Sequence, residues 1–289
     1  SIFGVSCIGS RGMAGVLPAE WLARESGGLT LEEGIREAGG EPARIAAEAR
    51  RDIAAFLELH IEQGPVLETE RLDIGVVTAI AGITRIEIIV EGRADHAGTT
   101  PMGSRADALA AAARLVSGIE ALAKSLAEGP GHFTATVGEF SIEPNAANVV
   151  PSRARLLIDA RAEERTAMDI FAASVERLAE QIARETGTII APPRRISDNM
   201  PTPGDPLLLD VLDAACEAVG AGHRRMASGA GHDTAFMAKV TRAAMIFVPC
   251  LGGRSHAPEE FAESDDIALG AAVLFNAVIQ LDEKLIQES

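Results

Sequence analysis

The order in which two kinds of apolar spacing follow one another between residues 82 and 192 constrains the fold more than any other feature of the chain. Apolar and polar residues alternate in segment 84–92, as in a half-buried strand, and segments 132–143, 154–162 and 186–195 are also predicted to be strands. Helical spacing occurs at 104–127, with Ser104 as the expected cap, and at 163–186, which ends at Gly187. The order is β-α-β-β-α-β, which predicts a ferredoxin-like unit over residues 82–192.

The segments on either side of this unit predict an α/β domain that the unit interrupts. Apolar runs typical of strands occur at 54–65, 74–82 and 243–250, and helical spacing occurs at 16–56, 205–219 and 264–284. We therefore expect a discontinuous α/β domain made of residues 1–81 and 193–289, with residues 82–192 inserted as a second domain.

The charge of the chain restricts the partners that it binds. It has 42 Asp and Glu residues against 26 Lys and Arg residues, so its net charge is −16. An acidic surface repels nucleic acid and anionic lipid. No uninterrupted apolar run reaches about 18 residues, the length that would indicate a membrane span. We therefore expect neither a nucleic-acid partner nor a membrane partner.

The cysteines and the start of the chain bear on its compartment. Cys7, Cys216 and Cys250 lie far apart and form no CxxC pair. This pattern predicts neither a disulfide framework nor a cysteine-based zinc site, and it favours a reducing cytoplasm. The first residues lack the basic start and the apolar stretch of a signal peptide. Because the chain begins with Ser1 rather than Met, we expect processing, trimming or truncation.

Four of the six histidines lie in loops that follow strand patterns or contain glycine: His60, His96, His232 and His256. Loops at strand ends commonly hold catalytic groups, because the scaffold positions the side chains while the loop leaves them accessible. Imidazole ligates metals and transfers protons near neutral pH. We expect the other two histidines, His132 and His223, to be structural or surface residues.

Each of these loops also has a purely structural explanation. The alternatives are a capped turn at 60–65, a loop closed by its own side chain–backbone bonds at 96–99, a turn that needs positive φ at 229–232, and an acidic helix start at 256–259. Four such loops in one chain favour a functional explanation for the set.

Asn148 and Arg161 are separate candidates in the inserted unit. Arg161 ends an apolar strand, where a guanidinium group would hold a carboxylate through two parallel hydrogen bonds. The alternative is a surface salt bridge with Asp159 or Glu163. No HExxH, GxSxG, P-loop or GxGxxG motif occurs, so a serine nucleophile, a phosphate loop and a dinucleotide fold have no local support.

Six motifs, in order along the chain, resemble the amidase/hydantoinase/carbamoylase family: FLELHIEQGPVLE, GVVTAIAG, ADHAGTTPMGSRADAL, NAANVVPSRARLLIDAR, SGAGHDTAFMA and RSHAPEE. The resemblance runs over about residues 1–285. The family includes N-carbamoyl-L-amino-acid hydrolases, β-ureidopropionases and allantoate amidohydrolases, within the superfamily of dinuclear zinc aminoacylases and carboxypeptidases. The resemblance implies a zinc-exopeptidase-like α/β catalytic domain with an inserted ferredoxin-like lid that mediates homodimerisation.

The resemblance also implies roles for individual residues. His60 and His256 would each ligate one of two divalent metal ions, which would be zinc, manganese or cobalt, and His96 would stabilise the oxyanion. Asn148 and Arg161 would hold the substrate carboxylate across the dimer interface. The residues that would contact the substrate, a small ureido compound with a carboxylate, are Gln63, Asn148, Arg161, Gly231 and His232.

The resemblance further implies an N-terminal segment that this sequence does not contain. That segment would carry an HxD histidine, a bridging aspartate and a Glu-Glu pair with the catalytic base. We therefore expect this chain to bind metal weakly or not at all and to be inactive alone. The expected activity of the intact protein is hydrolysis of N-carbamoyl-L-amino acids to the amino acid, ammonia and carbon dioxide.

Three alternatives to this activity stay open. Two are enzymes of the same superfamily: an allantoate amidohydrolase, and a dipeptidase or deacylase that acts on an amide. The third is a catalytically inert, metal-free fragment that acts only as a dimerising module.

Overall fold

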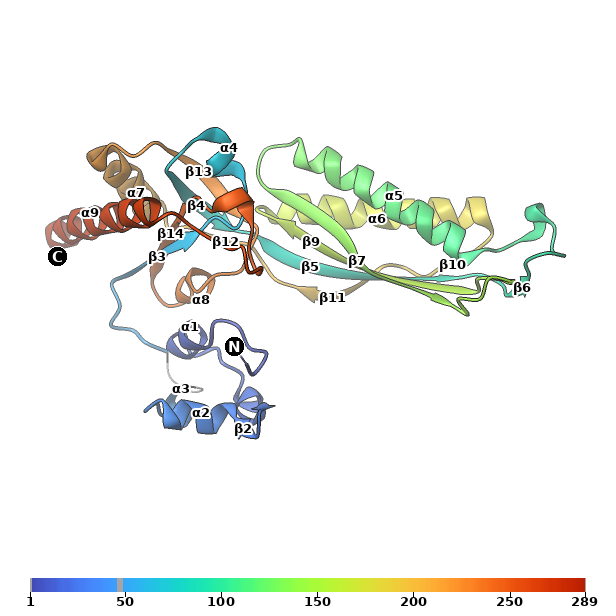
Figure 1. Ribbon diagram of the computed structural model, residues 1–289, viewed down its shortest axis with the longest axis horizontal. Coiled ribbons are helices and arrows are strands. Elements are labelled where there is room, and N and C mark those ends of the chain that lie inside the picture. The colour runs from blue at the N-terminus through green and yellow to red at the C-terminus, as the bar shows by residue number, and fades with distance from the viewer. Residues whose placement is uncertain (1, 46–48, 289) are drawn as a thin grey trace. The chain divides into compact units, whose positions relative to one another are not determined.

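The structure is a computed structural model that describes residues 2–45 and 49–288. The chain divides into two compact units, one made of Ser1–Ile80 and Thr202–Ser289 and the other of Ala81–Pro201. Each unit has a five-stranded sheet and a hydrophobic core of its own (Figure 1).

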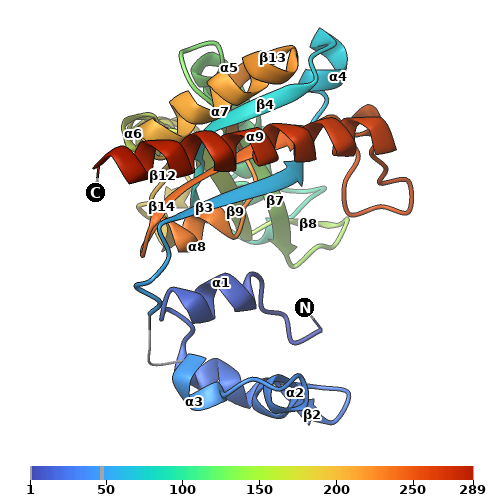
Figure 2. The same cartoon turned by 90° about the vertical axis from the view of Figure 1, so that its left-hand side faces the viewer.

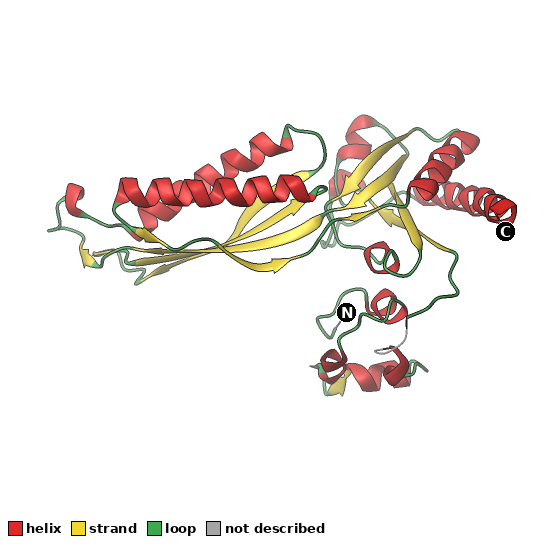
Figure 3. Cartoon of the chain, turned by 180° about the vertical axis from the view of Figure 1, so that it is seen from behind, coloured by secondary structure: helices red, strands yellow, loops and turns green. Residues whose placement is uncertain are grey.

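The Ala81–Pro201 unit is an antiparallel sheet with two long helices on one face (Figures 1 and 3). Its strands, in spatial order, are β10 (Ile189–Ile190), β5 (Gly82–Glu91), β9 (Arg153–Ala162) and β7 (Phe133–Glu143). Helices α5 (Ala108–Ala127) and α6 (Arg165–Thr186) follow β5 and β9 in the chain. The elements therefore run in the predicted β-α-β-β-α-β order.

The core of this unit follows from the period of two along its strands. Ile86 and Ile88 of β5 are buried, whereas their neighbours in the strand are partly or fully exposed. These residues bury against Leu115 of α5 and Phe171 of α6 in one continuous cluster. The Phe171 ring also lies 5.1 Å from the ring of Phe133, measured between centroids.

Two details of this unit differ from the sequence prediction. Helix α5 is capped by Asp107, whose carboxylate accepts a hydrogen bond from the Ala110 amide, and not by Ser104, which lies in the short helix η2 (Met102–Ser104). The strand predicted at 186–195 is two strands, because Pro192 and Pro193 have no N–H to donate to a sheet. The second of these, β11 (Arg194–Asp198), pairs with β5, so the unit extends beyond the predicted boundary at residue 192.

The sheet of the other unit combines parallel and antiparallel pairs. Its spatial order is β12 (Thr202–Pro203), β4 (Ile74–Ile80), β14 (Arg242–Val248) and β3 (Ala55–Ile61), and β13 (His223–Ser228) also pairs with β4. Strands β3 and β14 are parallel, whereas β14 and β4 are antiparallel. Two strand ends that carry loops, at Ile61 and Val248, therefore lie side by side.

Helices α7 (Pro206–Val219) and α9 (Ser264–Glu288) cover one face of this sheet (Figure 2). Asp205 caps α7 by accepting hydrogen bonds from the amides of Leu207 and Leu208. Leu57 and Leu59 of β3 and Ile246 of β14 point into the core under these helices. The opposite face carries the short helices α4 (Val66–Glu70) and α8 (Thr234–Met237) and a smaller core around Phe247.

Helix α9 is apolar on more than the face that it buries. Val273 and Ala277 lie in the core, whereas Phe275 and Ile286 are each 66% exposed. Among the described residues, the part of α9 from Ser264 to Ile286 is long and apolar enough to cross a membrane. Length and composition alone are weak grounds for a membrane span, because a core helix of a soluble protein passes the same test.

The first fifty residues form short elements and not one long helix. The glycine pair at 27–28 separates the two-residue strands β1 (Glu25–Ser26) and β2 (Leu29–Thr30), and the pair at 39–40 separates α2 (Leu31–Glu37) from α3 (Pro42–Ile45). Helices α1 (Ile8–Met13) and η1 (Ala19–Ala23) precede these elements. The guanidinium of Arg11 lies 5.0 Å from the ring centroid of Trp21 and 4.0 Å from that of Phe236. This stacking joins the segment to α8.

Replacing Phe171 by alanine tests the core of the Ala81–Pro201 unit. Phe171 is fully buried, and truncation of a buried Phe to Ala typically lowers the free energy of unfolding by about 3–5 kcal/mol. The adjacent Ile170 is 56% exposed, so Ile170→Ala provides a matched control that changes this free energy by less than about 1 kcal/mol. Urea unfolding followed by circular dichroism measures both, and equal losses would contradict this core.

Candidate active site

The parallel register of β3 and β14 brings two of the predicted loops together. His60 pairs with Phe247 and Ile61 with Val248, so the loops at 62–65 and 249–256 leave the same edge of the sheet. Because side chains alternate along a strand, His60 and Glu58 lie on the α4/α8 face, opposite the core beneath α7 and α9.

The ring of His60 is oriented by its own strand. Its Nδ1 lies 2.8 Å from the carbonyl oxygen of Ile61, and since a carbonyl only accepts, the hydrogen of the neutral ring is on Nδ1. The Nε2 lone pair is then available to a metal ion, as in metal sites whose histidine ligand donates its other nitrogen to a carbonyl. The ring of His232 lies edge-on to His60, 4.7 Å away between centroids.

His232 is almost completely buried beside His60. It is 3% exposed, and its Nε2 lies 2.7 Å from the hydroxyl oxygen of Ser228. Burial, with the nearby His60 ring, lowers the pKa of His232 to about 4, so the ring is neutral at pH 7. In this structure His232 supports the position of His60, whereas the predicted role was contact with substrate.

Gly231 lies on the surface beside His232. Neither Gly229 nor Gly231 has a positive φ, so the alternative of a turn that requires glycine does not hold here. A Cβ placed on Gly231 would have no atom within 4 Å, and the space next to this residue is open.

Gln63 joins the two loops through a chain of hydrogen bonds. Its side-chain Nε2 donates to the hydroxyl of Ser255 over 2.6 Å, and that hydroxyl donates to Oε2 of Glu260 over 2.9 Å. The amide of His256 donates to the same Glu260 oxygen. The hydrogen bonds from His256 and Ser255, followed by the charges of His256 and His60, lower the pKa of Glu260. Glu260 therefore lies within electrostatic range of both predicted metal-ligand histidines.

The backbones of these two loops are in direct contact. A Cβ on Gly253 would lie 2.6 Å from the carbonyl carbon of Gly64, which excludes any other residue type without a shift of the backbone. Glu62 is 8% exposed, and its carboxylate accepts hydrogen bonds from the amides of Val66 and Leu67 over 2.8 Å each. The structural alternative, a capped turn, thus describes Glu62, whereas Gln63 contacts the opposite loop.

The sequence analysis did not identify Ser255 and Glu260 of this network, nor Ser228, which contacts His232. Glu259, the acidic residue of the alternative at 256–259, pairs with Arg254 at 3.6 Å and does not join the network. The sequence feature that could have identified Glu260 is its spacing of four residues from His256. When this segment forms a turn, the Glu260 carboxylate reaches the His256 amide.

His96 and Asn148 lie next to each other in the Ala81–Pro201 unit. His96 ends β6 (Asp95–His96) and pairs with Val149 of β8 (Val149–Val150), and the Ala97 amide donates to the Asn148 carbonyl over 2.9 Å. Both side chains are exposed.

Arg161 lies in strand β9 of the five-stranded sheet, far from Asn148. Asn148 is in the loop at the Arg153 end of β9, and eight residues of extended strand between Arg153 and Arg161 span about 26 Å. The Nε of Arg161 donates to Asp159 over 2.8 Å, which is the surface salt bridge that the sequence offered as its alternative. One chain therefore does not bring Arg161 and Asn148 together.

The residues that this structure describes do not complete a metal site. Within 2–45 and 49–288, no three His, Cys, Asp or Glu side chains are placed to hold one ion. The free Nε2 of His60 suits one coordination position, but a catalytic zinc ion normally has three protein ligands.

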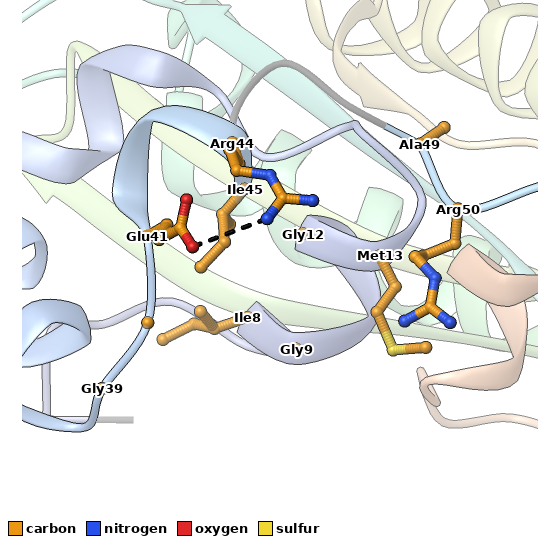
Figure 4. A pocket seen from close by; sticks show the side chains of 11 residues that line it. Ile8, Gly9, Gly12, Met13, Gly39, Glu41, Arg44, Ile45, Ala49 and Arg50 are labelled. Atoms are coloured by element: carbon orange, nitrogen blue, oxygen red, sulfur yellow. Dashed lines mark hydrogen bonds and ion pairs between the residues drawn. The ribbon is translucent and has the colours of Figure 1, made fainter.

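A separate cavity of about 430 Å³ lies among the first fifty residues (Figure 4). It is bordered by α1 and α3, and its charged pair is Arg44 with Glu41, 3.5 Å apart. It contains none of the predicted site residues, so the candidate site is the β3–β14 edge and not this cavity.

Comparison with known proteins places this chain in a family. The pattern of peptidase family M20/M25/M40 matches residues 9–280. The chain is 35% identical over 284 residues to the N-carbamoyl-L-amino-acid amidohydrolase of Paenarthrobacter aurescens, which covers 97% of this chain and 68% of that protein. It is 35% identical over 285 residues to the allantoate amidohydrolase of Bacillus subtilis (strain 168), with coverage of 97% and 68%.

Solved structures support the same family assignment. The amidase of the hydantoinase/carbamoylase family from Burkholderia multivorans superposes with a TM-score of 0.84 at 35% identity, over 96% of this chain and 66% of that chain. A dinuclear metal binding peptidase of the M20 family from Bacillus subtilis shares the fold, with a TM-score of 0.55 at 18% identity.

The chain belongs to peptidase family M20/M25/M40. Within it, the two amidohydrolases and the hydantoinase/carbamoylase amidase named above each match at 35% identity, which confirms the predicted family, the α/β fold class and the enzyme class that acts on C–N bonds. The chain spans 55–68% of the length of the curated relatives that it matches.

The lowered pKa of His232 predicts a pH dependence of stability in the metal-free chain. Between pH 6.5 and about 4 the unfolded chain binds a proton at this histidine and the folded chain does not, so stability is full above pH 6.5 and falls towards pH 4. Protonation of His232 in the unfolded chain lowers the free energy of unfolding by on the order of 3 kcal/mol by pH 4.

Urea unfolding at pH 7.5 and pH 4.5 measures this loss. The wild-type chain should lose more stability on acidification than His232→Gln, whereas His223→Gln should behave like the wild type. Equal losses in the wild type and His232→Gln would contradict the buried neutral ring.

Proposed function

We propose that this chain is part of a metal-dependent amidohydrolase that cleaves N-carbamoyl-L-amino acids to the amino acid, ammonia and carbon dioxide. The observation that carries the proposal is the convergence of His60, Gln63 and His256 at the paired ends of β3 and β14, linked through Glu260. The similarity to the Paenarthrobacter aurescens amidohydrolase over 97% of the chain supplies the reaction.

The proposed cofactor is a pair of divalent ions, zinc, manganese or cobalt, with His60 and His256 as one ligand to each. Such ions supply a water molecule that is activated as a nucleophile at neutral pH. Since the described residues do not complete the coordination, the chain's own contribution is to orient these imidazoles. His232 and the Ile61 carbonyl fix the ring of His60, and Glu260 fixes the backbone of His256.

Individual residues have proposed contacts with the substrate. Gln63 and the open surface at Gly231, beside His232, would contact the ureido compound near the metals, and His96 would donate a hydrogen bond to its carbonyl oxygen. Arg161 would exchange Asp159 for the substrate carboxylate, to which its planar guanidinium group is matched.

A homodimer through the Ala81–Pro201 unit would reconcile the positions of these residues. Asn148 and His96 lie at one end of the sheet and Arg161 at the other, about 26 Å away by strand length. In a dimer, the two ends of one unit would serve the sites of different subunits, and this unit would act as the lid. We further propose a cytoplasmic location, because Cys7, Cys216 and Cys250 are all free thiols.

Two other functions have specific support. Allantoate hydrolysis is favoured by the Bacillus subtilis allantoate amidohydrolase, which matches at the same 35% identity as the carbamoylase. An inert dimerising module is favoured by the absence, among the described residues, of three side chains placed to hold a metal. A dipeptidase or deacylase activity has no such support beyond the M20 family itself.

Ammonia release tests the proposed function. The chain is assayed alone and fused to the part of the Paenarthrobacter aurescens relative that the alignment does not cover, each with Zn²⁺, Mn²⁺ or Co²⁺. N-carbamoyl-amino acids, allantoate and a dipeptide are the substrates. We expect the fusion to release ammonia fastest from N-carbamoyl-L-amino acids, and faster allantoate hydrolysis would favour the second function.

Matched histidine variants complete this test. His60→Ala should lower the activity of the fusion by more than about 100-fold, because the loss of a ligand costs at least as much as the loss of its supporting partner. His223→Ala removes a histidine of β13 that pairs with Asp213 at 3.5 Å, and it should leave the activity unchanged. Failure of every ureido substrate would contradict the proposal.

A further inference from the structure

The loop that carries His96 fixes which nitrogen of its imidazole bears the hydrogen. The backbone amide of Gly98 donates a hydrogen bond to Nδ1 of His96 over 3.0 Å. An amide N–H donates only, so Nδ1 must accept, and the hydrogen of the neutral ring is on Nε2. This assignment depends on a backbone group whose direction is fixed, and not on a hydroxyl or an amide that could turn.

The loop itself is held by one guanidinium group. Nη2 of Arg105 donates to the carbonyl of Ala97 over 2.6 Å and to that of Thr100 over 2.8 Å, and its Nε donates to Thr100 over 3.1 Å. These two carbonyls flank the Gly98 amide in sequence. The side chain of Arg105 is half-buried, and it bridges the carbonyls of Ala97 and Thr100.

Further backbone bonds close the loop on both sides of His96. The His96 carbonyl accepts from the amide of Thr100 over 3.1 Å, and the Ala97 amide donates to the Asn148 carbonyl over 2.9 Å. A Cβ on Gly98 would lie 3.3 Å from Cε1 of the His96 ring, so the ring is seated closely against this residue.

This arrangement suits a group that must donate a hydrogen bond to a developing negative charge. A ring with hydrogen on Nε2 presents a donor on its exposed side, whereas the other tautomer would present a lone pair there. A donor that is oriented before the reaction needs no reorganisation when charge develops, which is the source of most oxyanion stabilisation.

We propose that Arg105 is a positioning residue for His96, and that it acts by holding the Gly98 amide against Nδ1 so that Nε2–H is a preformed donor to a carbonyl oxygen. The use of this donor on a ureido carbonyl rests on the proposed function. The tautomer and its dependence on Arg105 are properties of the folded chain alone.

Nitrogen NMR of the histidine-labelled chain tests the tautomer without substrate or metal. His96→Gln assigns the resonances. In the wild type, Nδ1 of His96 should resonate as the pyridine-type nitrogen and Nε2 as the pyrrole-type nitrogen. A pyrrole-type Nδ1 would overturn the proposal, whatever the activity of the protein.

Arginine variants test the positioning role by the same measurement. In Arg105→Gln, the His96 resonances should move towards an average of the two tautomers. Arg114→Gln is the matched control, because Arg114 is an exposed arginine of the same unit that pairs with Glu185, and it should leave them unchanged. If Arg105→Gln does not fold, Arg105→Lys is measured instead, since it keeps the charge but loses the planar fork that reaches two carbonyls. Unchanged His96 resonances in the folded variant would overturn the proposal.

A kinetic arm applies to the active fusion. Arg105→Gln should lower kcat by about 10–100-fold with little change in KM, because it affects a group used in the transition state. In a His96→Gln background the same substitution should have no further effect. An additive loss would mean that Arg105 acts through another group and would contradict the proposal. An inactive fusion would contradict the proposed function, whereas the NMR results would still decide the role of Arg105.

Discussion

The parallel pairing of β3 with β14 is the constraint on which the candidate site depends. Its register is fixed because Leu57, Leu59 and Ile61 must enter the core beneath α7 and α9. A slip of one residue would turn His60 into that core and expose the leucines, at a cost of several buried apolar side chains. The same register sets the 62–65 loop against the 249–256 loop, where Gly253 and Gly64 are in backbone contact.

In three histidines, His60, His96 and His232, a different local contact sets the hydrogen position or the charge of the ring. The Ile61 carbonyl places the hydrogen of His60 on Nδ1, and the Gly98 amide places that of His96 on Nε2. Burial keeps His232 uncharged. One imidazole thus offers a lone pair, another offers a donor and the third is a neutral support. The proposed roles of a metal ligand, an oxyanion donor and a packing partner would need these three states, although the residue type is the same.

The sequence predicted what depends on local pattern and missed what depends on distant contacts. The β-α-β-β-α-β order follows from periodicity, and His60, Gln63 and His256 follow from motifs at strand ends. Ser255 was missed because its role depends on Gln63, which is 192 residues away in the chain. Arg105 was missed because nothing in its neighbourhood shows that its guanidinium turns back onto the carbonyls of 97 and 100. The position of Arg161, far from Asn148, depends on the register of the whole sheet.

The contact between the two loops is the central claim, and a nuclear Overhauser experiment on the metal-free chain tests it most directly. If the β3–β14 register is as described, the side-chain amide protons of Gln63 should show strong cross-peaks to the β protons of Ser255, since Nε2 of Gln63 lies 2.6 Å from Oγ of Ser255, which is bonded to Cβ. The ring protons of His60 and His232 should show cross-peaks as well. The absence of the Gln63–Ser255 cross-peaks in the folded chain would contradict the account.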